Sequence, residues 1–147
     1  MLPIATTTDL GGIRLGTGLH GAPDGTVSSI DRFSLYFNDY IFGLSATWVA
    51  TGSCSISAGV NPGIAMLEVG PKQPITFDIY YLDNHTAYSE SPPKVGVISF
   101  PAGNGAVTGT ITFSQAVAME AGNVLGIHKP KPTDAQAKGC RLVIAAS

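Results

Sequence analysis

The sequence predicts an all-β protein: an antiparallel, jelly-roll-like β-sandwich preceded by an extended glycine-rich N-terminal arm. Short stretches alternate apolar and polar residues, which is typical of half-buried strands. The 18 Gly and 10 Pro place turn signals between these stretches at close spacing. No stretch carries a helical repeat of useful length, and 147 residues fit one domain with a short appendage. We therefore expect an attachment or oligomerisation arm over residues 1–29 and a sandwich over residues 30–147.

The arm is defined by its glycines, which occupy positions 11, 12, 16, 18, 21 and 25. Between them lie short β-favouring pieces at 13–15 and 26–30, with Asp24-Gly25 as a turn signal. Pieces of this length with few large side chains bury no core of their own. The arm therefore needs a neighbour: the rest of the chain, another copy, or a larger assembly.

The strand signal is strongest over 75–81, where Ile75, Phe77, Ile79 and Tyr81 fall on one face. The piece 64–69 also fits a helical turn, but Gly70-Pro71 follows at once and favours a strand. Asn38-Asp39 indicates a bulge or a turn. Further strands are expected at 33–37, 40–42, 46–50, 54–57, 94–100, 106–113, 117–122, 124–127 and 142–145, with loops at 83–93 and 129–138. In the strand 94–100 we expect Val95, Val97 and Ser99 to share a face.

Charge narrows the range of partners. Only 12% of the residues are charged, about half the usual share, which suggests that partners cover part of the surface. A net charge of −2 argues against a nucleic-acid binder, which usually carries a basic patch. The cationic cluster Lys129, Lys131, Lys138 and Arg141 is broken by prolines, so we interpret it as a solvated loop.

The compartment follows from signals that the sequence lacks. Residues 1–4 carry no basic region before an apolar run, so we expect no signal peptide. No window reaches the roughly 20 apolar residues that span a bilayer, so we expect no membrane partner. A protein made in the cytosol keeps its thiols reduced, and Cys54 and Cys140 are expected to be buried thiols; a disulfide between them is the less favoured alternative.

No catalytic motif is present, so we expect neither an enzyme nor a cofactor. The sequence has no nucleophile elbow, P-loop or zincin pattern. His20, His85 and His128 stand apart from one another, without the spacing of metal ligands. A metal site assembled across subunits remains an alternative.

The aromatic residues Tyr80, Tyr81 and Tyr88 allow two interpretations. The favoured one is strand packing with a loop anchor. The other is a stacking surface for sugar rings, since aromatic faces beside polar loops suit carbohydrates. In that case His85 and Tyr88 form a possible ligand-facing loop.

The opening segment resembles a phrase of tailed-bacteriophage fibre proteins. It reads ATTTDLGGIRLG over residues 5–16, followed by DGTVS over residues 24–28. Residues 109–125 and 142–144 also look like β-domains of phage fibre tips or decoration proteins. The resemblance implies a virion structural protein, most often a homotrimer, assembled in the host bacterial cytoplasm. Because the phrase occurs once in this chain, a capsid decoration, cement or head-fibre protein is favoured over a long receptor-binding fibre.

The resemblance also implies a mode of action. The arm would attach the protein to the major capsid protein or another virion protein, through strand addition. The alternative is a short tail fibre or receptor-binding tip, whose loops 83–93 and 128–139 recognise a host surface glycan. The expected attachment residues are Thr6, Thr7, Thr8, Asp9, Leu10, Gly11, Gly12, Ile13, Arg14 and Leu15.

Overall fold

The computed structural model describes residues 9–10, 13–14, 19–21, 27–29, 32–83 and 92–147. The chain divides into two compact units. One comprises residues 1–31 with Ser147, and the other comprises residues 32–146.

The first unit contains two short antiparallel ladders. Strand β1 (Asp9–Leu10) pairs with β2 (Ile13–Arg14), and β3 (Leu19–Gly21) pairs with β4 (Val27–Ser29). The β-favouring pieces expected near 13–15 and 26–30 thus contain strands. The turn expected at Asp24-Gly25 lies outside the described residues.

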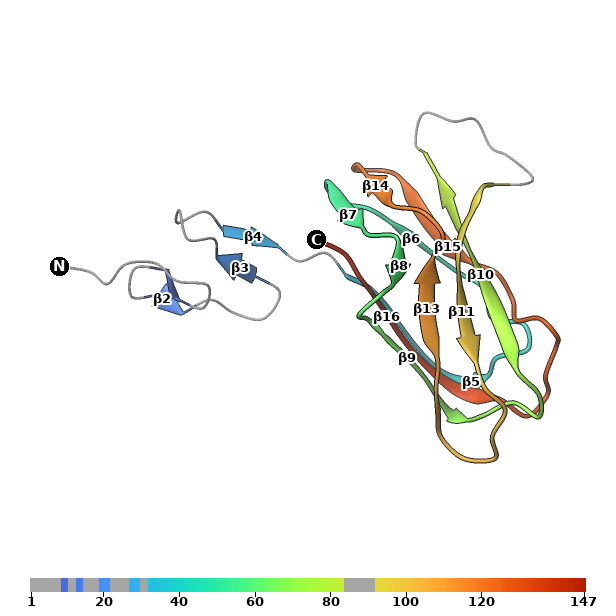
Figure 1. Cartoon of the computed structure of the whole chain (residues 1–147). Helices are drawn as coiled ribbons and strands as arrows, with labels where there is room; N and C mark the ends of the chain where they lie inside the picture. The colour runs from blue at the N-terminus through green and yellow to red at the C-terminus, as the bar shows by residue number, and fades with distance from the viewer. Residues whose placement is uncertain (1–8, 11–12, 15–18, 22–26, 30–31, 84–91) are drawn as a thin grey trace. The chain divides into compact units, whose positions relative to one another are not determined.

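The second unit is built from two antiparallel sheets that stack face to face (Figure 1). The larger sheet has the order β6-β15-β10-β11-β13-β8, and the smaller one has the order β12-β9-β16-β5. A separate ladder joins β14 and β7. The strands are β5 (Arg32–Tyr40), β6 (Ala46–Val49), β7 (Cys54–Ile56), β8 (Gly59–Val60), β9 (Ile64–Val69), β10 (Ile75–Leu82), β11 (Lys94–Phe100), β12 (Val107–Thr108), β13 (Thr110–Phe113), β14 (Val117–Met119), β15 (Val124–Ile127) and β16 (Lys138–Ala145).

The core lies between the two sheets. From the larger sheet, Ile75, Phe77 and Ile79 of β10 are all at most 1% exposed. From the smaller sheet, Leu67 and Leu142 meet them in the same apolar cluster. Because each strand buries alternate side chains, both inner faces contribute to one core. The all-β fold class and the β-sandwich are confirmed.

One expected strand is in fact two, because the chain changes sheets at Gly109. The stretch 106–113 keeps its alternation throughout, but β12 pairs with β9 in the smaller sheet while β13 pairs with β11 in the larger. A Cβ at Gly109 would lie 2.6 Å from the carbonyl oxygen of Ser99 and 2.7 Å from the Phe100 ring. Only glycine lets the backbone cross so close to β11.

The expectation that Val95 shares a face with Val97 and Ser99 is wrong. The register between β10 and β11 shifts at Ile79/Tyr80, so that Tyr80 pairs with Lys94 while Ile79 pairs with Gly96. Val95 is fully buried, whereas Val97 is only half-buried. The irregularity breaks the alternation of faces between the two valines.

Of the two alternatives at Asn38-Asp39, the structure shows the bulge. Cys140 pairs with Phe37 and Lys138 pairs with Tyr40, so β5 has one more residue than β16 between these two pairs. Strand β5 therefore continues to Tyr40 without a turn. Opposite the bulge, Gly139 has a φ of 73°, a conformation that favours glycine.

Both cysteines are buried thiols, as expected. Cys54 is 7% exposed and Cys140 is 2% exposed. They form no disulfide. Burial raises the pKa of the Cys140 thiol to about 11.

Candidate binding surfaces

The structure describes only part of the sites predicted from the sequence. Asp9 and Leu10 pair with Arg14 and Ile13 in the ladder of β1 and β2. The other expected attachment residues, Thr6, Thr7, Thr8, Gly11, Gly12 and Leu15, lie outside the described residues, as do His85 and Tyr88, whereas His20 lies in β3 opposite Ser28.

The outer face of the larger sheet contains a hollow of about 250 Å³, here called the Gly126 hollow. Gly126 of β15 lies between Tyr80 of β10 and Thr47 of β6 in the strand register. Having no side chain, it forms a floor between these two neighbours. The lining is Ser45, Thr47, Tyr80, Tyr81, Leu82, Pro92, Val124, Gly126, Ile127 and His128.

The Tyr80 ring at this hollow is held on two sides. Its hydroxyl donates a hydrogen bond to Asp78 Oδ2 at 3.3 Å. The His128 ring meets it edge to face, with centroids 6.2 Å apart and an interplanar angle of 81°. A backbone hydrogen bond from His128 N to the Asp78 carbonyl, 3.1 Å long, ties the two strands at this point. The aromatic wall is therefore fixed before any ligand arrives.

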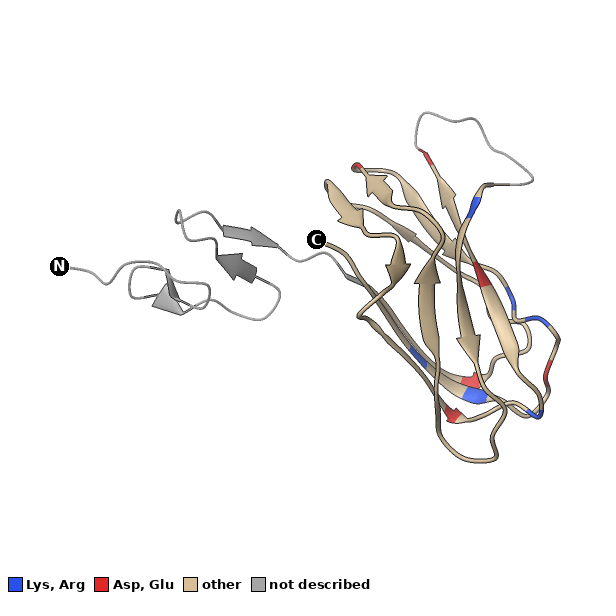
Figure 2. Cartoon of the chain, viewed as in Figure 1, with Lys and Arg blue, Asp and Glu red and all other residues tan. Residues whose placement is uncertain are grey.

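Asp78 is the centre of a charged cluster beside the hollow. Lys94 Nζ lies 2.7 Å from Asp78 Oδ1, and Lys131 Nζ lies 3.3 Å from Oδ2. Burial opposes ionisation of this carboxyl, but the hydrogen bonds and charges of the two lysines outweigh it and lower its pKa. Figure 2 shows the acidic position in β10 between basic positions at the start of β11 and after β15. Two positive charges thus meet one negative charge.

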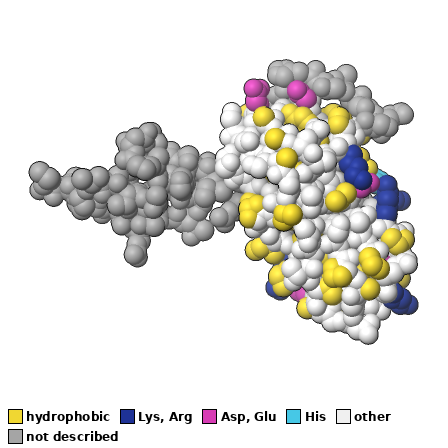
Figure 3. Space-filling model, viewed as in Figure 1, with side chains coloured by type: hydrophobic (Ala, Val, Ile, Leu, Met, Phe, Trp, Pro, Cys, Tyr) yellow, Lys and Arg dark blue, Asp and Glu magenta, His cyan; other side chains and the backbone are white. Residues whose placement is uncertain are grey.

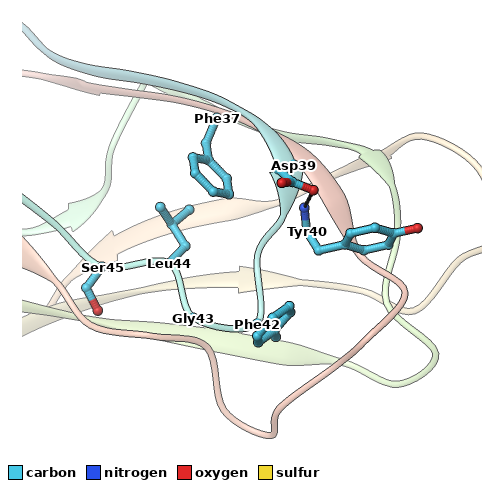
Figure 4. A pocket seen from close by; sticks show the side chains of 7 residues that line it. All are labelled: Phe37, Asp39, Tyr40, Phe42, Gly43, Leu44 and Ser45. Atoms are coloured by element: carbon cyan, nitrogen blue, oxygen red, sulfur yellow. Dashed lines mark hydrogen bonds between the residues drawn. The ribbon is translucent and has the colours of Figure 1, made fainter.

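A second pocket, of about 450 Å³, lies at the connection from β5 to β6 and is here called the Phe42 pocket. Tyr40 is 47% exposed and Phe42 is 55% exposed. Figure 4 shows Phe37 and Leu44 next to each other, with the Tyr40 ring pointing away from them. The ammonium group of Lys138 lies 5.7 Å from the centre of the Tyr40 ring. The exposed rings make this end of the sandwich apolar.

The third surface is the outer side of the smaller sheet, here called the Tyr36 face. Its open depression of about 720 Å³ is lined by Ser34, Leu35, Tyr36, Ile64, Met66, Arg141, Leu142 and Val143. Tyr36 is 60% exposed and Ile64 is 50% exposed. Arg141 lies over the Tyr36 ring at 5.6 Å and pairs with Glu68 at 3.2 Å. The Tyr36 face is therefore apolar and carries one ion pair, between Arg141 and Glu68.

The space-filling view shows how side-chain types are distributed over one side of the molecule. Apolar side chains form several separate groups, and basic side chains gather along one edge with acidic and histidine atoms among them (Figure 3). Within residues 32–83 and 92–147, and in the described pieces before them, no three His, Cys, Asp or Glu side chains lie close enough to hold a metal ion. The same part of the chain contains no helix that could cross a membrane.

Tyr80 and Tyr81 were recognisable from the sequence as aromatic candidates, and Pro92 and His128 fall in the loops predicted to meet a glycan, but the hollow that joins them was not predicted. The place of Gly126 and His128 beside Tyr80 depends on the pairing of β10 with β15, which the local sequence does not carry. A glycine inside a strand is the signal that was available, since it weakens the strand unless something needs the space.

Comparisons with known proteins find no family. No protein-family model matches the chain, and no curated protein matches it. Among solved structures, CsCBM6-3 from Clostridium stercorarium in complex with cellobiose matches at a TM-score of 0.36 and 11% identity, over 89% of this chain and 83% of that one. SACOL2612, a CocE/NonD family hydrolase from Staphylococcus aureus, matches at a TM-score of 0.38 and 8% identity, over 86% of this chain and 34% of that one. Both TM-scores are too low to bear on what this chain binds.

Proposed function

We propose that this chain is a structural protein of a bacteriophage particle, a homotrimeric capsid decoration, cement or head-fibre protein. The N-terminal residues 1–29 attach it to the major capsid protein or another virion protein, and the sandwich lies on the particle surface. Support from the sequence is the fibre-like phrase over residues 5–16 and 24–28. This role needs no catalytic group and no cofactor.

The observation that carries the proposal is the Tyr36 face. Two large apolar side chains, Tyr36 and Ile64, are at least half exposed on one sheet. Large exposed apolar patches mark interaction surfaces. In a trimer these faces pack between copies, and three arms bound at once make weak single contacts sufficient.

The test removes the arm. Phage particles made without this protein are mixed with the full chain or with a chain lacking residues 1–29, and co-sedimentation is measured. We expect the full chain to sediment with the particles and the shortened chain to stay in solution, still folded by circular dichroism. Binding of the shortened chain to particles would contradict the role of the arm.

A second candidate, a receptor-binding tip that recognises a host surface glycan, is favoured by the Gly126 hollow. Pro92 and His128, which line it, belong to the two loops predicted to meet a glycan, 83–93 and 128–139. A fixed aromatic ring beside hydroxyl groups suits a sugar.

This second candidate is tested on a glycan array and on the particle. We expect a glycan signal that Tyr88→Ala reduces, since Tyr88 is the predicted ligand-facing aromatic of the first loop. Normal adsorption to the host by particles that lack the protein would dismiss the candidate.

A further inference from the structure

Gly126 lies inside strand β15 at a place where the fold leaves room for a side chain. A Cβ built on it would lie 3.4 Å from Thr47 Cγ2 and 3.5 Å from the Ala46 carbonyl oxygen, both ordinary contacts. At Gly96, by contrast, a Cβ would lie 2.5 Å from the Thr112 carbonyl oxygen. Packing therefore demands glycine at 96 but not at 126.

Backbone conformation does not demand glycine at 126 either. The described glycines with positive φ are Gly59, Gly122 and Gly139, and Gly126 is not among them. A glycine inside a strand costs roughly 0.5–1 kcal/mol relative to alanine. One role of a strand glycine is to let a ligand or another backbone approach closely, and the open space at Gly126 is compatible with that role.

The walls of the hollow indicate what approaches. Tyr80 presents a ring fixed by Asp78 and His128, and an immobile ring loses little entropy when a flat partner stacks on it. Ser45 Oγ accepts the backbone N–H of Lys129 at 3.2 Å, which leaves its hydroxyl proton to donate to a ligand. The volume of about 250 Å³ suits a single six-membered ring rather than a peptide segment.

Charge beside the hollow selects among ring-shaped ligands. Lys94 and Lys131 share the single carboxylate of Asp78, so the cluster keeps an excess positive charge. Lys129, directly after His128, adds another positive charge at the Tyr80 side of the hollow. Burial raises the pKa of the Tyr81 hydroxyl, as do the nearby acids Asp83 and Glu120. The positive charge is therefore confined to the side of Tyr80 and Asp78. An anionic group is favoured over a neutral one on the Tyr80 side, because its charge there meets the lysines around Asp78.

We propose that the Gly126 hollow binds one uronic-acid ring of an acidic polysaccharide, stacked on Tyr80 with its carboxylate toward the lysines around Asp78. This inference rests on the second candidate function, glycan recognition, and names its ligand class and its site. It requires neither a metal ion nor a covalent step.

The experiment uses the full chain and an array of matched oligosaccharides. The probes are uronic-acid trisaccharides of gluco, galacto and manno configuration, each paired with its methyl ester, which keeps the ring and removes the charge. We expect at least one acid to bind several-fold more tightly than its ester, with the preference shrinking as salt is raised from about 20 to 500 mM. Affinities are then measured by titration calorimetry.

Variants locate the site. Gly126→Val fills the floor and Tyr80→Leu removes the stacking ring, and each is expected to weaken binding of the acid at least tenfold. Thr110→Val, on β13 of the same sheet and away from the hollow, is the matched control and leaves binding unchanged. Lys131→Gln is expected to reduce the preference for acid over ester while binding of the ester stays the same.

Each negative result would overturn a different part of the proposal. Binding of an acid that neither Gly126→Val nor Tyr80→Leu weakens would overturn the site. Equal binding of acid and ester through the hollow would overturn the uronic-acid assignment and leave glycan recognition standing. An array without signal for any acidic or neutral sugar would overturn glycan recognition and the inference together, leaving the structural role to its own test.

Discussion

At the scale of single residues, Asp134 is the buried acid that joins two loops. Its Oδ2 accepts the backbone N–H of Lys72 at 2.8 Å, and its Oδ1 accepts those of Gln136 at 2.8 Å and Ala137 at 2.9 Å. The residue is 5% exposed. A carboxylate with three backbone donors can replace regular structure in a loop, here the proline-rich segment before β16.

Replacing Asp134 by alanine is expected to lower the free energy of unfolding by about 2–4 kcal/mol, because three backbone donors lose a charged acceptor. Urea unfolding at pH 7 measures this change. The matched control is Asp39→Ala, since the exposed Asp39 accepts one local bond, from Tyr40 N at 2.7 Å. Asp39→Ala should cost less than about 1 kcal/mol; equal losses for the two variants would contradict the assignment.

The same carboxyl makes stability depend on pH. Burial raises the pKa of Asp134, but hydrogen bonds from Ala137, Lys72 and Gln136 outweigh it and hold the pKa below its ordinary value of 3.8. A lowered pKa in the folded state contributes stability that is complete above 3.8 and is lost as the pH falls through the folded value. The gap in unfolding free energy between wild type and Asp134→Ala should be constant from pH 7 to 5 and shrink below about pH 4. A gap that persists unchanged to pH 2 would be inconsistent with this.

The thiols give a third prediction at this scale. Burial raises the pKa of Cys140 to about 11, so almost no thiolate forms at pH 8. We expect neither cysteine of the folded protein to react with a disulfide reagent within minutes, and both to react in guanidinium chloride. Cys54→Ala isolates the Cys140 signal. Fast reaction of the folded Cys54→Ala variant would show that Cys140 is accessible.

At the scale of elements, two strand glycines differ in their surroundings: a side chain at Gly96 would clash with the neighbouring strand, whereas Gly126 has room for one. Gly96→Ala pushes a Cβ to within 2.5 Å of the Thr112 carbonyl oxygen, which the partner strand β13 holds in place. We expect a loss of about 1–3 kcal/mol in the free energy of unfolding. Gly126→Ala meets only ordinary contacts and should be neutral, or more stable by roughly 0.5–1 kcal/mol. Thermal unfolding of both variants is the measurement, and equal destabilisation would show that the Gly126 hollow is not open.

How far the sequence predicts these elements depends on whether the signal is local. Strand β10 was predicted closely, because Ile75, Phe77 and Ile79 alternate without interruption. The change of sheet at Gly109 was not, because alternation continues across it and only the contact with Ser99 and Phe100 forces the break. The bulge that turns Val95 inward depends on the register with β10, which the residues of β11 alone do not carry.

In the candidate sites, too, only the residues with a local signal could be predicted from the sequence. Tyr80 was recognisable as an aromatic residue near a polar loop, but its neighbours Gly126, in β15, and His128, just after β15, are more than forty residues away in the sequence. The Tyr36 face likewise joins β5, β9 and β16, and its central pair links Glu68 to Arg141. Arg141 was assigned to a solvated loop; it lies in β16 with its side chain over Tyr36, because the closing strand begins earlier than its apolar residues indicate.

At the scale of the whole molecule, exposed apolar side chains lie on more than one surface. Tyr36 and Ile64 lie on the smaller sheet, and Tyr40 and Phe42 lie at the β5–β6 connection, all at least 47% exposed. A chain with only 12% charged residues has few groups with which to keep such surfaces apart in solution. This combination fits a protein that works while attached to copies of itself and to a larger surface.

The last prediction tests that self-association on the full chain. Ile64→Lys places a charge on the Tyr36 face, where a second copy would have to bury it, so we expect the proposed trimer to become monomeric. Val60→Lys is the matched control, because Val60 is 73% exposed on β8 of the other sheet. Light scattering coupled to size-exclusion chromatography measures the mass, and circular dichroism checks that both variants fold. A monomeric wild-type chain would contradict the trimer itself, and a trimer that survives Ile64→Lys would show that the Tyr36 face does not hold the copies together.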